Sequence, residues 1–211
     1  MKNYQLLLQT SSLVEKGLVV MQETIHLTPR DTAPLHILAW NYQQLQSAFT
    51  SALNNNYAAG IVNVRAAFEG IVFMRKYRTD KKAAAKWLED LEYNSDKTHA
   101  IILELKKTDA KFTEYYEHYR ALSKLSHPYP KTRLLLSKTQ KGRRPINYNN
   151  DFNETWATVV LAEILFAIVN SLNEIQPVIN AQTPYGKQLA TFQHTFSKQA
   201  NVVFKQLQKN I

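Results

Sequence analysis

Long stretches of helical periodicity, with few glycines or prolines between them, constrain the fold of this chain most. Its 211 residues contain only 5 Gly and 7 Pro, a balance that favours helices over a sandwich or a barrel. Apolar side chains such as Leu38, Leu45 and Phe49 recur at helical spacing, which indicates an amphipathic helix. We therefore expect an all-α, up-and-down bundle of five to seven helices.

Local signals give the approximate bounds of these helices. Asp31 or Thr32 can cap the second helix, with Pro34 in its first turn, and Asp109 can cap the fifth. Asp151 or Asn153 can start the sixth. No internal repeat or domain boundary is evident, so we expect one domain over 1–211, in which a core bundle over about 31–175 carries the first and last helices. The expected helices span residues 4–27, 32–53, 57–78, 80–105, 109–126, 153–174 and 185–208.

Residues 130–150 break the helical pattern and concentrate positive charge. The pattern around Lys141-Gly142 is compatible with a small hairpin. The chain has a formal net charge of +9, and no acidic residue falls between 131 and 144. Such clustering is typical of a surface that binds RNA or another polyanion, although a solvated loop would carry the same charges. The predicted nucleic-acid-binding residues are Lys131, Arg133, Lys138, Lys141, Arg143 and Arg144.

Charged residues also interrupt apolar helix faces. Arg65 and Glu69 lie one turn apart, within or beside the apolar stripe of their helix. An unpaired buried charge costs several kcal/mol, so we expect the two to pair with each other or with a polar group on the helix that carries Arg120. A polar seam of Glu163, Asn170 and Glu174 can likewise face a ligand, a water channel or an arginine; a buried structural hydrogen bond is the plainer alternative.

Composition excludes several classes of site and location. The chain has no cysteine, which rules out disulfides and thiolate chemistry and suits a reducing compartment. The apolar run 155–172 contains Glu163 and Asn170, so we expect a buried helix there rather than a membrane span. The Glu-x-x-His pair Glu23/His26 lacks the further carboxylates that a di-iron bundle requires. We expect a cytoplasmic protein with no metal, no cofactor and no membrane partner.

Arg120 and His127 form the candidate catalytic pair. At about 100° per residue their side chains lie about 20° apart around a helix axis, two turns from each other. Because His127 precedes Pro128, the helix should end near Ser126 and leave the imidazole at its carboxyl end, where the helix dipole favours the imidazolium. Such a pair can bind phosphate or donate a proton.

Residues 63–71 (NVRAAFEGI), together with 119–123 (YRALS) and His127-Pro128, resemble bacterial proteins related to abortive-infection factors, which belong to or lie near the HEPN superfamily of helical bundles. That superfamily is marked by an arginine followed, after four to six residues, by a histidine. The resemblance implies a phage-defence or toxin-type module that binds RNA or nucleotide phosphates, often as a homodimer.

In active members the resemblance implies a metal-independent endoribonuclease whose site is completed across a homodimer. Arg120 would then neutralise phosphate, His127 would act as acid or base, and Arg65 and Glu69 would support them. Those members usually place Asn, Asp or His directly after the arginine, whereas this chain has Ala121. Ala121 favours a binding module, with the ribonuclease as one alternative and a protein-interaction bundle without a nucleic-acid role as another.

Overall fold

The computed structural model describes residues 2–28, 32–90, 97–126, 152–179 and 184–210. These ranges contain eight α-helices, one short 3-10 turn and no strand, which confirms the all-α prediction but exceeds the five to seven helices expected. The hairpin predicted within 130–150 lies outside the described residues. The helices are α1 (Lys2–Leu27), α2 (Ala33–Leu53), α3 (Tyr57–Thr79), α4 (Lys81–Glu89), α5 (Thr98–Leu105), α6 (Lys111–Ser126), α7 (Glu154–Ile175) and α8 (Pro184–Asn210).

The extra helix arises because the segment predicted as one helix over 80–105 forms two. α4 ends at Glu89, and Asp90 is extended, with φ −111° and ψ 100°. Helices in proteins gain most of their stability by packing an apolar face, and none of the nine residues of α4 is fully buried. The periodicity over 80–105 is therefore a poor guide to helix length, because α4 packs on the core only through the part-buried side chains of Ala83, Ala84 and Trp87.

Side-chain caps fix several helix starts where the sequence predicted them. The Asn153 side chain accepts a hydrogen bond from the Trp156 amide at 3.1 Å and begins α7. The Asp109 carboxylate accepts one from the Lys111 amide at 3.0 Å before α6. Each cap satisfies an amide that the first helical turn leaves without a partner. Thr32 occupies the N-cap position of α2, but its side chain makes no capping hydrogen bond.

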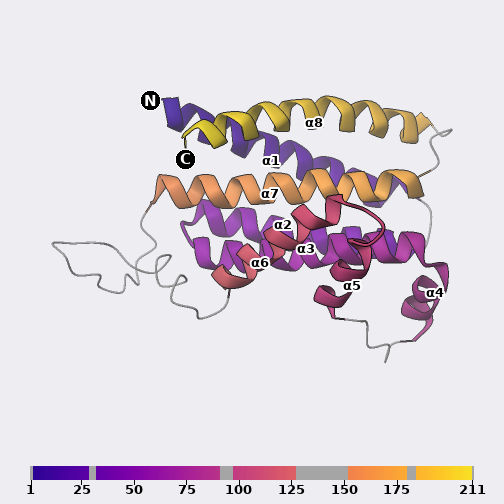
Figure 1. Cartoon of the computed structure of the whole chain (residues 1–211). Helices are drawn as coiled ribbons and strands as arrows, with labels where there is room; N and C mark the ends of the chain where they lie inside the picture. The colour runs from indigo at the N-terminus through magenta and orange to yellow at the C-terminus, as the bar shows by residue number, and fades with distance from the viewer. Residues whose placement is uncertain (1, 29–31, 91–96, 127–151, 180–183, 211) are drawn as a thin grey trace.

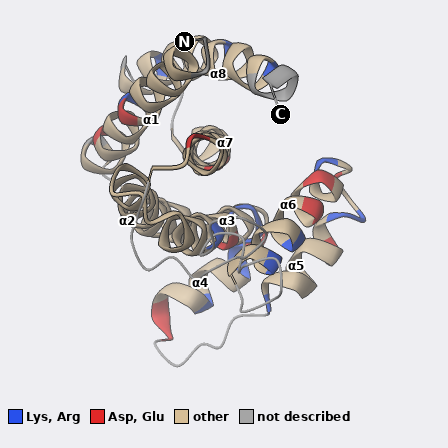
Figure 2. Cartoon of the chain, turned by 90° about the vertical axis from the view of Figure 1, so that its left-hand side faces the viewer, with Lys and Arg blue, Asp and Glu red and all other residues tan. Residues whose placement is uncertain are grey.

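Helix α7 runs through the middle of the bundle. α1 and α8 pack on one side of it and α2 and α3 on the other, while α4, α5 and α6 lie beyond α3 (Figures 1 and 2). Both α3 and the segment Glu154–Val178 are long and apolar enough to cross a bilayer, but 56% of the apolar window in each is buried inside the bundle. The predicted packing of the apolar run 155–172 within the protein is therefore present.

Two glycines allow close approach of helices around α7. A Cβ on Gly17 would lie 2.7 Å from a methyl carbon of Ile168, so α1 can contact α7 there only because that atom is missing. A Cβ on Gly70 would lie 1.9 Å from the Asn41 side-chain oxygen. Asn41 is fully buried and donates to the Ser171 hydroxyl at 3.1 Å. The side of α7 that faces α1, α2 and α3 is thus closely packed.

Candidate ligand-binding groove

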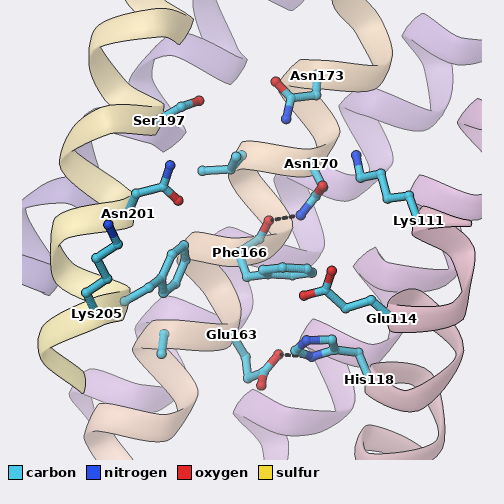
Figure 3. A pocket seen from close by; sticks show the side chains of 13 residues that line it. Lys111, Glu114, His118, Glu163, Phe166, Asn170, Asn173, Ser197, Asn201 and Lys205 are labelled. Carbon is cyan, nitrogen blue, oxygen red and sulfur yellow. Dashed lines mark hydrogen bonds and ion pairs between the residues drawn. The ribbon is translucent and has the colours of Figure 1, made fainter. Parts of the chain in front are cut away.

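The opposite flank of α7 is open. α6 packs on α3 and α5, and a groove of about 670 Å³ lies between α6 and α8, with α7 as its floor (Figures 2 and 3). Pockets of this volume accommodate small-molecule ligands. Its lining is Lys111, Glu114 and His118 from α6, Ala162, Glu163, Phe166, Val169, Asn170 and Asn173 from α7, and Ser197, Asn201, Phe204 and Lys205 from α8.

A histidine–carboxylate pair connects α6 to α7 in the groove. His118 Nδ1 lies 3.5 Å from Glu163 Oε2, with side-chain exposures of 30% and 23%. The imidazole stacks on the Phe166 ring at a centroid distance of 4.5 Å. The contact with Glu163 raises the pKa of His118, and it outweighs the burial that acts in the opposite direction. The groove therefore holds a histidine biased toward its cationic form.

The walls of the groove carry cations, and its floor carries amides and aromatic rings. Lys111 projects from α6 and Lys205 from α8, on either side of α7, and both side chains are exposed (Figure 3). Asn170 and Asn173 of α7 lie between these walls (Figure 3). Lysine supplies a point charge for an anion, and a side-chain amide both donates and accepts hydrogen bonds. The combination suits a ligand with an anionic group and further polar atoms.

Glu174, the last residue of the predicted seam, serves a different purpose. Its side chain is 5% exposed, and Oε2 lies 3.0 Å from Arg78 Nη2 and 3.5 Å from Arg75 Nη1. Arg75 also donates to Asp109 at 2.7 Å. Burial raises the pKa of Glu174, while Arg75 and Lys111 act against that rise. An arginine was one of the partners predicted for the polar seam, and Glu174 contacts two of them. Glu163 instead faces the groove.

Arg65 and Glu69 pair with each other, as expected from their positions. Arg65 Nη2 lies 3.0 Å from Glu69 Oε1, and Arg65 Nη1 donates to the Ser126 hydroxyl at 3.3 Å. The guanidinium also lies 5.7 Å from the centre of the Tyr119 ring. These contacts attach α3 to the helix that carries Arg120, but neither residue lines the groove.

Arg120 lies on the exposed side of α6. Its contacts are with residues of the same helix and not with the Arg65–Glu69 pair. Its side chain is 49% exposed, Nη1 lies 3.5 Å from Glu117 Oε2, and its guanidinium lies over the Tyr116 ring. His127 lies outside the described residues, so the Arg120–His127 pair stays a prediction. The same holds for Lys131, Arg133, Lys138, Lys141, Arg143 and Arg144.

Sequence reasoning missed the α6 side of the groove. Lys111, Glu114 and His118 follow one another at i, i+3 and i+7, a spacing that places them on one helix face. That spacing is a usable signal, but it is equally typical of a solvated surface face. Within the described ranges no group of three or more His, Asp or Glu side chains is arranged to hold a metal ion.

Comparison with known proteins adds no relative. No family model matches the chain, and neither does any curated protein or solved structure. The resemblance to HEPN bundles therefore stays a prediction that rests on the residues quoted for it.

Proposed function

We propose that the protein is a binding module for RNA or nucleotide phosphates, and that the α6–α7–α8 groove receives the phosphate-bearing group. The observation that carries this proposal is the placement of three basic side chains around one groove. Lys111 and His118 come from α6, and Lys205 comes from α8. In addition, the Phe166 and Phe204 rings in the lining offer apolar surface to a base or ribose.

The charges of the groove favour an anion when His118 is protonated. Lys111, Lys205 and the imidazolium of His118 then face Glu114 and Glu163, and Glu163 is already engaged by His118. The formal net charge of +9 for the whole chain adds a positive field that attracts polyanions and speeds their association. Glu114 is left as an acceptor for hydroxyl or amino groups of the ligand.

The test removes the two lysines together. In Lys111→Ala/Lys205→Ala we expect at least tenfold weaker binding of a short fluorescent single-stranded oligoribonucleotide, measured by anisotropy. The dependence of affinity on salt should become shallower, by roughly 0.7 in slope for each phosphate that the variant no longer neutralises. Lys16→Ala/Lys187→Ala is the matched control, because it removes the same charge at exposed positions of α1 and α8 that do not line the groove.

Equal weakening in both double variants would show that net charge alone binds RNA, and the groove would lose its proposed role. Binding that depends instead on Lys141, Arg143 and Arg144 would assign the interaction to the basic segment 131–144.

We further propose that the protein is a cytoplasmic, HEPN-like homodimer that takes part in phage defence or toxin regulation. A metal-independent endoribonuclease that uses Arg120 and His127 is the alternative. A protein-interaction bundle without RNA binding is the second alternative. Absence of oligoribonucleotide binding at low salt would favour it.

A further inference from the structure

His118 differs from the two lysines of the groove because its charge is conditional. Lysine stays protonated throughout the physiological range, whereas an imidazole titrates within it. His118 is also held in place, with Glu163 at 3.5 Å on one side and the Phe166 ring stacked against it. A bound anion near this ring would interact strongly with the imidazolium and weakly with the neutral imidazole.

Every element around His118 contributes to this balance. α7 supplies Glu163, and α6 itself supplies Glu114 and Lys111. α8 supplies Lys205 to the groove, and α3 presents the uncharged Phe68 ring, 5.8 Å from the imidazole centre. Glu163 and Glu114 both favour the imidazolium. Burial of the imidazole acts against them, and the net effect raises the pKa of His118.

We propose that anion binding in the groove is coupled to protonation of His118, so that the ligand's phosphate and a proton are taken up together. This inference rests on the proposed function and adds its regulation: the module binds phosphate more tightly as the pH falls. By linkage, an anion that favours the imidazolium raises its proton affinity, and protonation raises the affinity for the anion by the same factor. Between the pKa of His118 in the free protein and its higher pKa in the complex, uptake of one proton lowers the affinity by about tenfold for each unit of rising pH.

The test measures proton uptake directly. Titration calorimetry of the oligoribonucleotide in buffers of different ionisation enthalpy gives the number of protons bound per ligand. We expect net uptake, up to one proton, by the wild-type protein at a pH near or above the pKa of His118, which NMR of the imidazole protons determines. His118→Gln should abolish the uptake. His194→Gln is the matched control, because His194 is exposed on α8 and does not line the groove.

Glu163→Gln separates a titration effect from a general disturbance of the groove. It keeps His118 and the size of its neighbour but removes the charge that raises the pKa of His118. We therefore expect the imidazole titration and the pH dependence of binding to move together to lower pH.

The outcomes distinguish the two proposals. Binding that needs Lys111 and Lys205 but shows no proton uptake, or the same uptake in His118→Gln, overturns the coupling and leaves the groove as the binding site. Absence of oligoribonucleotide binding at every pH tested overturns both proposals.

Discussion

Glu163 and Glu174 lie on the same face of α7, about three turns apart, yet their surroundings are opposite. Glu174 is almost fully buried and contacts two arginines of α3. Glu163 is 23% exposed and contacts one histidine across an open groove. Arginine is always charged in proteins, so the cationic side of the Glu174 cluster does not titrate. The His118–Glu163 pair depends on a proton and is open to solvent and ligand.

The contrast shows how one helix can serve both stability and binding. Around Glu174, α3, α7 and the start of α6 are tied by Arg75, Arg78 and Asp109. This cluster holds the start of α6 near α7, and two turns further along α6 the His118 ring stacks on Phe166 of α7. These contacts position His118 opposite Glu163 and leave the groove open between α6 and α8.

The largest effect on stability should come from Glu174→Gln. It leaves Arg78 part-buried without its acidic partner, whereas Arg75 keeps Asp109. Removal of one partner of a buried ion pair costs about 3–5 kcal/mol, and we expect the low end, about 3 kcal/mol, because Arg78 is 21% exposed. Urea unfolding followed by circular dichroism measures it.

Glu163→Gln is the control for that comparison. We expect a decrease of no more than about 1 kcal/mol in the free energy of unfolding. Both side chains of the His118–Glu163 pair are partly exposed, and solvent weakens the attraction between them. Equal decreases in Glu163→Gln and Glu174→Gln would remove the distinction between a structural cluster and a ligand-facing pair.

A smaller effect should appear in the pH dependence of stability. The pKa of His118 is raised in the folded protein, so its contribution to stability is complete below the unfolded pKa of about 6.5. That contribution is lost as the pH rises through the folded pKa. We expect the free energy of unfolding to fall by less than about 1 kcal/mol over this window, and the fall to shrink in Glu163→Gln. A fall of unchanged size in that variant would assign it to another group.

The sequence predicted one side of this site and not the other. Apolar periodicity identified α7 and its seam of Glu163, Asn170 and Glu174, because three polar residues in a helix otherwise apolar nearly all round are conspicuous. The partners of Glu163 and Glu174 lie 45 to 99 residues away in the chain, and helical spacing says nothing about which face of α6 turns toward α7. Lys111, Glu114 and His118 therefore looked like an ordinary solvated face.

The ends of the helices show the same division between local and tertiary information. Asn153 and Asp109 were predictable caps because a cap is satisfied within a few residues. The end of α4 at Glu89 was not predictable, because the spacing of residues 80–105 does not show that no residue of α4 is fully buried.

The smallest effect should follow replacement of Arg120, the residue that the HEPN resemblance singles out. Arg120 is half exposed and contacts Glu117 on its own helix, and such surface pairs contribute from zero to about 1 kcal/mol. We expect Arg120→Ala to change the free energy of unfolding by less than about 0.5 kcal/mol and to leave oligoribonucleotide affinity unchanged, because Arg120 does not line the groove.

The ribonuclease alternative predicts RNA cleavage that resists EDTA and falls by about 10²–10⁴-fold in both Arg120→Ala and His127→Ala. Gel analysis of labelled RNA decides between them: such cleavage would make the Arg120–His127 end of α6 the active site, whereas intact RNA with unchanged affinity in Arg120→Ala would leave binding to the groove around His118.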